Sequence, residues 1–147
     1  MVRLLVVDDE PSFRLLAKMV LEEHPAFQVV GEAGNGKEAV EQARRLQPDA
    51  ILLDLNMPVM GGLQALPKLR AVSPASRLFV VSVARDQQEL HQAKMAGAHA
   101  FIDKALPNDD FVAALRGCLE VVDMQWSEHR RDTFGPAPTL DRSSRRA

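Results

Sequence analysis

Five short segments of the chain are almost continuously apolar, and most of them are rich in Val, Ile and Leu. Runs of this kind, which hardly alternate between apolar and polar residues, are typical of parallel strands buried on both faces. We therefore expect strands at Val2–Val7, Phe27–Glu32, Ala50–Asp54, Leu78–Val83 and Ala100–Asp103.

Between these segments, apolar residues recur at the spacing of one helix face. The first such stripe consists of Phe13, Leu16, Ala17 and Val20, at i, i+3, i+4 and i+7. Pro67 lies inside a later pattern and should kink or shorten that helix. Besides the first helix, we expect helices over about 39–46, 63–69, 86–96 and 111–122.

Strand and helix patterns alternate five times along the chain. This order predicts an α/β fold in which a five-stranded parallel sheet carries helices on both faces. In such folds the functional site lies beyond the carboxyl ends of the strands. The residues that follow the strands are therefore the first candidates for chemistry.

Composition limits the possible functions. The chain has 147 residues, of which 46% are hydrophobic and 26% are charged, a balance typical of one globular domain. Its net charge of −2 argues against binding to nucleic acid by electrostatics. It has neither a membrane-spanning apolar stretch nor a signal-peptide pattern. The single cysteine, Cys118, excludes an internal disulfide and fits a reducing cytoplasm.

The texture of the sequence changes near its end. After Trp126 the apolar periodicity disappears, and Ser, Arg, Gly, Pro and Thr dominate. We expect one domain over residues 1–124 and a mostly disordered tail over 125–147. Such a tail is too short for a DNA-binding domain, which needs about 50 residues or more.

Charged and polar residues gather at the predicted strand ends. Asp8 and Asp9 follow the first strand, Asp54 ends the third, Ser82 lies at the end of the fourth, and Lys104 follows the fifth. Mg²⁺ prefers oxygen ligands and would offset the repulsion within the acid pair. Asp9 and Asp54 could bind it directly, and Asp8 through water. Asp54 could also form an acyl phosphate, whose oxygens Lys104, Ser82 and the metal would stabilise.

Four sequence stretches carry a resemblance to a known family. They are VVDDEP, QPDAILLDLNMP, VVSVAR and GAHAFIDKA. Over residues 1–122 the chain resembles the receiver domains of bacterial response regulators. The resemblance implies a flavodoxin-like sheet of strand order 2-1-3-4-5. It also implies that Asp54 accepts a phosphoryl group from the phosphohistidine of a histidine kinase or phosphotransfer protein. Asp8, Asp9 and the backbone carbonyl of Asn56 would bind Mg²⁺ in that reaction.

The resemblance further implies a switch rather than an enzyme, with slow autodephosphorylation. Ser82 would move toward the phosphoryl group, and Phe101 would change its rotamer. The surface of the fourth helix, fifth strand and fifth helix would then change its preference for a downstream protein or for a second copy of the chain. We expect a stand-alone receiver that acts on a protein partner. The alternative is the receiver half of a DNA-binding transcriptional regulator.

The chain departs from the family pattern at three places. Ala105 follows the lysine where proline is usual, which removes a constraint on the loop. Gly61 stands where an acid commonly caps the third helix. Val83 follows Ser82 where a small residue is common, and it could narrow access to the phosphoryl group.

Two other functions are less favoured by the sequence. Residues 31–37 fit the G-x4-G-K part of a nucleotide-binding loop, but Glu38 replaces the Ser or Thr that would bind magnesium. We interpret this stretch as a turn into a helix, with Asn35 or Gly36 near its cap. An aspartyl phosphatase of the haloacid dehalogenase type would carry a D-x-D motif after its first strand. Here the acid pair comes first, and Asp54 follows later.

Overall fold

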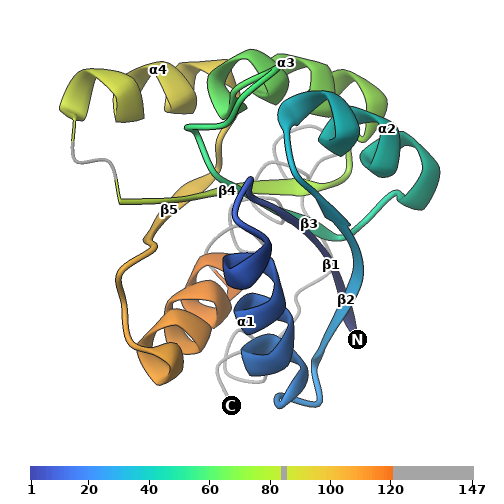
Figure 1. Ribbon diagram of the computed structural model, residues 1–147, viewed down its shortest axis with the longest axis vertical. Coiled ribbons are helices and arrows are strands. Elements are labelled where there is room, and N and C mark those ends of the chain that lie inside the picture. The colour runs from blue at the N-terminus through green and yellow to red at the C-terminus, as the bar shows by residue number, and fades with distance from the viewer. Residues whose placement is uncertain (84–85, 121–147) are drawn as a thin grey trace, which may run out of the picture. The chain divides into compact units, whose positions relative to one another are not determined.

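Five parallel strands form one sheet in the order β2-β1-β3-β4-β5, as the resemblance implied. The computed structural model describes residues 1–83 and 86–120 (Figure 1). All strands lie close to their predicted positions, and β4 begins and ends one residue earlier than expected. The strands are β1 (Val2–Val7), β2 (Phe27–Ala33), β3 (Ala50–Leu53), β4 (Arg77–Ser82) and β5 (Ala100–Asp103).

Helices cover both faces of this sheet, as predicted. In Figure 1, α2, α3 and α4 lie on one face, and α1 lies on the other. A further helix occupies residues 108–120, so the described residues contain five helices. Residues Met1–Leu115 form one compact unit, and Arg116–Ala147 form a second, of which only 116–120 are described. The four other helices are α1 (Pro11–Glu22), α2 (Gly36–Leu46), α3 (Gly62–Val72) and α4 (Gln87–Ala96).

The central strands of the sheet are buried on both faces, which explains their continuous apolar runs in the sequence. Every residue of β3 is buried, and so are the last four residues of β1. Alternate strand side chains point to opposite faces, so a strand covered on both sides needs apolar residues throughout. The core includes Leu5, Val7, Ile51 and Leu53, together with Leu66 and Leu69 of α3. This packed sheet holds the carboxyl ends of its strands in fixed positions.

Two helices differ from the sequence expectation. The helix α3 continues through Pro67 to Val72 and is not shortened. Pro67 lies on the exposed side of α3, where water can solvate the carbonyl that its missing N–H leaves unbonded. In α1, Leu16 was expected in the buried stripe but is 47% exposed, whereas Ala17 and Leu21 are buried.

The end of the predicted domain and the predicted tail over 125–147 lie outside the described residues. Within the described residues, no helix has the length and apolar character needed to cross a membrane.

Candidate functional site

The acidic residues after β1 and β3 are brought together by pairing of the strand ends. The Asp8 N–H donates to the Ala33 carbonyl at 3.0 Å, and the Asp54 N–H donates to the Val7 carbonyl at 3.0 Å. These bonds extend the sheet ladder by one residue beyond each strand. Asp8 and Asp54 are both buried, and they lie at the same edge of the sheet, where the fold predicts a site.

Lys104 reaches this edge from the loop after β5. Its Nζ lies 2.8 Å from Asp8 Oδ2, 3.6 Å from Asp54 Oδ2 and 3.3 Å from Glu10 Oε1. The lysine side chain is only 12% exposed. Its main-chain N–H donates to the Ser82 carbonyl at 3.2 Å, which ties the loop to the end of β4. The structure thus joins Asp8, Asp54 and Lys104 in one cluster.

The electrostatics of Asp54 reflect its enclosure. Burial raises the pKa of the Asp54 carboxyl, and the nearby Asp8 raises it further. A hydrogen bond from the Asn56 N–H to Asp54 Oδ1, at 3.3 Å, opposes this rise, and so does the charge of Lys104. Burial and the neighbouring acid thus both disfavour the ionised form of Asp54, and the Asn56 N–H and the Lys104 ammonium favour it.

The Lys104 ammonium is held in its charged form. Burial acts to lower the pKa of Lys104, but its interactions with Asp8, Asp54 and Glu10 outweigh burial and raise it. An ammonium in this position can stabilise negative charge that develops beside Asp54.

The donor atoms beside β1 suit a divalent cation. Oxygens of Asp8, Asp9 and Glu10 all lie within 4.8 Å of one another. Asp8 Oδ2 is buried and accepts no hydrogen bond from the described residues, although it faces the Lys104 ammonium. Carboxylate oxygens of this kind are the ligands that Mg²⁺ prefers, so the residues fit the expected ion. Asp54 does not belong to this group of three, and ligation by the Asn56 carbonyl stays a prediction.

Glu10 is a member of the cluster that the sequence analysis did not assign to the site. It is the N-cap residue of α1 but makes no side-chain capping bond, because its carboxylate is directed to Lys104 instead. The only signal in the sequence was its position beside the acid pair.

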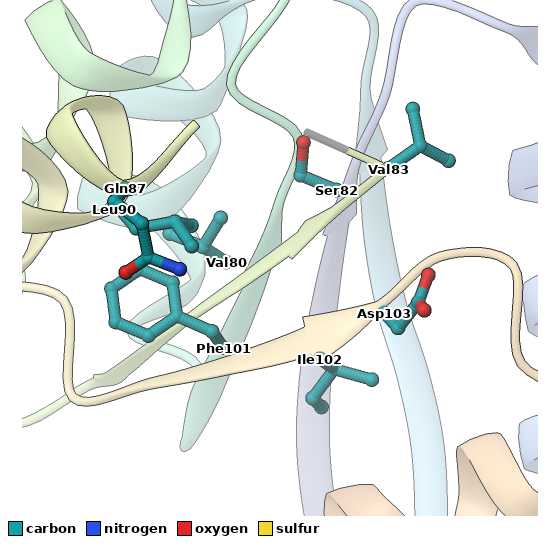
Figure 2. A pocket seen from close by; sticks show the side chains of 8 residues that line it. All are labelled: Val80, Ser82, Val83, Gln87, Leu90, Phe101, Ile102 and Asp103. Atoms are coloured by element: carbon teal, nitrogen blue, oxygen red, sulfur yellow. The ribbon is translucent and has the colours of Figure 1, made fainter. Parts of the chain in front are cut away.

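Ser82 and Phe101 border a cavity on the side of β4 that faces β5 and α4. The cavity has a volume of about 340 Å³ and lies between the end of β4, β5 and α4 (Figure 2). Ser82 is 7% exposed, whereas Phe101 is 38% exposed and turns its ring toward α4. The cavity is lined by Val80, Ser82, Val83, Gln87, Leu90, Phe101, Ile102 and Asp103.

The glycine-rich stretch before α2 is a helix start, as interpreted from the sequence. The Asn35 side chain accepts a hydrogen bond from the Glu38 N–H at 2.9 Å, and Glu38 Oε2 accepts one from the Gly34 N–H at 2.8 Å. These two capping bonds occupy main-chain donors that a phosphate-binding loop would need. Gly36 is required by close packing, because a Cβ there would lie 2.7 Å from the Met60 carbonyl oxygen.

Comparison with known sequences gives one consistent family. A family model described as the response regulator receiver domain matches residues 4–116. The nitrate/nitrite response regulator protein NarL of Escherichia coli strain K12 is 41% identical over 112 residues, 76% of this chain and 52% of NarL. The chemotaxis protein CheY of Thermotoga maritima is 35% identical over 113 residues, 77% of this chain and 93% of CheY.

Solved structures agree with these relatives. The response regulator domain of Thermotoga maritima CheB is 34% identical and has a TM-score of 0.67, over 74% of this chain and 81% of that one. A CheY-like receiver domain protein from Methanospirillum hungatei is 25% identical and has a TM-score of 0.75, over 87% and 98%. The chain spans 52% of the length of NarL. From its sequence and its fold, this chain belongs to the response regulator receiver family of two-component signalling.

Proposed function

We propose that this receiver is switched by phosphorylation of Asp54, with a phosphohistidine of a histidine kinase or phosphotransfer protein as the donor. One observation carries the proposal. The Lys104 ammonium lies within 3.6 Å of Asp54 and within 2.8 Å of Asp8, although the three residues come from different loops. A buried nucleophile, a fixed cation and a set of metal-binding oxygens together suit transfer of a phosphoryl group.

The transfer exchanges one bond for another. A carboxylate oxygen of Asp54 attacks the phosphorus atom, an O–P bond forms, and the N–P bond to the donor imidazole breaks. The imidazole nitrogen keeps the electron pair. Lys104 and the Ser82 hydroxyl then interact with oxygens of the acyl phosphate. Mg²⁺, held by Asp8, Asp9, Asp54 and the Asn56 carbonyl, would neutralise charge on the phosphoryl oxygens when bound.

The output of the switch is a change on the face formed by α4, β5 and the helix at 108–120. Movement of Ser82 toward the phosphoryl group would open space at the cavity, and Phe101 would turn from its exposed position into it. The partner is a protein that distinguishes the two positions of Phe101, in the same chain, in a second copy or in a separate molecule. We infer that this exchange takes place in the cytoplasm, without direct contact of this chain with nucleic acid or membrane.

Substitution of the acceptor tests the proposal. With Mg²⁺ and acetyl phosphate, the wild-type chain should gain one phosphoryl group by intact-protein mass spectrometry, and Asp54→Asn should gain none. Asp109→Asn, at an exposed acid of the helix at 108–120, is the matched control and should label as the wild type does. Equal labelling of Asp54→Asn would show that the acceptor lies elsewhere.

The same preparation separates a switch from an aspartyl phosphatase. Receiver domains of the CheY and NarL type are non-catalytic switches, so the chain should form a stoichiometric phosphoaspartate and lose it slowly. Steady release of p-nitrophenol from p-nitrophenyl phosphate over many turnovers would instead favour the phosphatase.

A further inference from the structure

The Lys104 ammonium has an aromatic partner besides its acidic ones. Its Nζ lies 4.6 Å from the centroid of the Phe13 ring, on the first turn of α1. The spacing of Phe13 in the sequence indicated ordinary core packing. The structure instead leaves Phe13 half-buried, with its ring under a charge carried by a residue from the other end of the domain.

The ring differs from the carboxylates in how it holds the ammonium. Asp8 and Asp54 are the groups that a metal ion and a phosphoryl group would engage, so their attraction for Lys104 changes during the reaction. Glu10 is an exposed anion, and solvent screens it. The Phe13 ring has no net charge and binds no metal, but its negative face attracts a cation within about 6 Å. Its attraction therefore persists while the charges around it change.

The loop that carries Lys104 lacks a restraint that this contact can replace. Ala105 stands where the resembling family usually has proline, so the main chain after the lysine has no ring to fix its φ angle. Its N–H, which proline would lack, donates to Asp103 Oδ1 at 2.9 Å. A turn closed by side-chain and main-chain hydrogen bonds is a softer constraint than a proline ring, and a contact at the tip of the lysine can supply the missing restraint.

We propose that Phe13 is a positioning residue for phosphoryl transfer, and that its ring holds the Lys104 ammonium beside Asp54 by a cation–π contact. This inference rests on the proposed function, because it assigns Phe13 a role in the same reaction. In this role Phe13 acts through Lys104, whose ammonium lies over its ring.

Graded fluorination of Phe13 provides the test. Phenylalanine with one, two or three fluorines on its ring, incorporated at residue 13, loses cation-binding power stepwise while its shape stays nearly constant. The rate constant for labelling of Asp54 at saturating acetyl phosphate and Mg²⁺ should fall stepwise, by about two- to fivefold for the trifluorinated ring. The rate constant of Phe13→Leu, which keeps an apolar side chain, should fall as far as that of the trifluorinated chain. Phe13→Trp, which keeps an aromatic face, should label at the wild-type rate.

A second readout needs neither metal nor phosphodonor. In the wild-type chain, each fluorine on Phe13 should increase the equilibrium constant for urea unfolding, by about two- to threefold over the series. In a Lys104→Leu background the same series should leave that constant unchanged. A structural role for the ring alone would give the same trend in both backgrounds.

The outcomes separate the two proposals. If the wild-type chain is labelled at Asp54 and the fluorinated chains are labelled at the same rate, Phe13 has no role in positioning Lys104, and the proposed function stays intact. Equal unfolding trends with and without Lys104 would also overturn the role of Phe13. If the wild-type chain takes up no phosphoryl group, the proposed function fails, and the role of Phe13 in the reaction fails with it.

Discussion

A single imidazole before β5 should make the stability of the sheet depend on pH. His99 Nδ1 accepts a hydrogen bond from the main-chain N–H of Leu78 at 2.9 Å. The main-chain N–H of His99 donates to the Leu78 carbonyl at 2.8 Å. Partial burial of the ring lowers the pKa of His99, and the positive charges of Arg70 and Arg77 lower it further. The neutral ring, with an unprotonated Nδ1, is therefore the form that the folded chain stabilises.

The sign of the pH effect follows from this shift. Above the ordinary histidine pKa of 6.5, both folded and unfolded chains carry a neutral ring, and its contribution to stability is complete. As the pH falls below 6.5, the unfolded chain takes up the proton first, so the free energy of unfolding decreases. The decrease ends below the lower pKa of the folded state.

Replacement of this imidazole isolates its contribution. In His99→Asn, the amide oxygen can accept the same hydrogen bond but does not titrate. We expect the change in unfolding free energy between pH 7.5 and pH 5.5, measured with urea, to be smaller in His99→Asn than in the wild type. His91→Asn, at an exposed position of α4, is the control. An unchanged pH dependence in His99→Asn would show that His99 does not cause the loss of stability at low pH.

The residues of the cluster differ in how far the sequence could predict them. Asp8, Asp54 and Lys104 follow apolar runs, and the rule for parallel sheets places such positions at one edge. Phe13 satisfied the rule for a core position equally well. Its contact with Lys104 depends on how α1 packs against the loop after β5. These two segments are far apart in the sequence, so no local pattern predicts the contact.

Among the elements, the connection from β3 to α3 tolerates only a hydrogen at one position. A Cβ on Gly62 would collide with the Asp54 carbonyl oxygen and would lie 2.9 Å from the Leu55 Cα. The Gly62 N–H also donates to the Leu55 carbonyl at 2.9 Å. The helix α3 therefore starts directly against the backbone of Asp54, the proposed acceptor.

Adding a methyl group at this junction should displace either α3 or Asp54. We expect Gly62→Ala to reduce the free energy of unfolding by about 1–3 kcal/mol and to slow labelling of Asp54 by acetyl phosphate. Gly117→Ala is the matched control, because a Cβ there meets nothing within 4 Å. In the interior of a helix, this change should stabilise by about 0.5–1 kcal/mol. A Gly62→Ala chain as stable as the wild type would contradict the close packing.

Element boundaries were predictable where local chemistry fixes them. The start of α2 follows from Asn35 and Glu38. The Asn35 side chain accepts from the Glu38 N–H and the Glu38 side chain accepts from the Gly34 N–H, a capping pattern that can be read in the sequence. The length of α3 was not predictable, because tertiary packing of Leu66 and Leu69 holds the helix together through Pro67. Tertiary contacts also determine which residues of α1 are buried. The apolar stripe of α1 is wider than its buried face, so Leu16 stays exposed.

Across the sheet, one row of paired residues leads from the end of β3, beside the proposed acceptor Asp54, to β5. Leu53, the residue before Asp54, pairs with Val80 of β4, and Val80 pairs with Phe101 of β5. Ser82 lies two residues beyond Val80 and lines the same cavity that Phe101 borders. A change at Asp54 can therefore reach the α4–β5 face across a single strand. The modest charge added by a phosphoryl group can only shift a position that already has two accessible states.

Filling the cavity should separate phosphorylation from this transmission. Leu90→Phe adds bulk from α4 into the space that Phe101 would enter, and it leaves the acidic cluster untouched. With 4-fluorophenylalanine at position 101, phosphorylation of the otherwise wild-type chain should produce a new ¹⁹F resonance, because the ring moves from solvent into an apolar site. In the Leu90→Phe chain we expect full labelling of Asp54 without that resonance. Met95→Phe, on an exposed position of the same helix, should behave as the wild type does. If the new resonance persists in Leu90→Phe, Phe101 does not use this cavity, and the signal must leave β4 by another route.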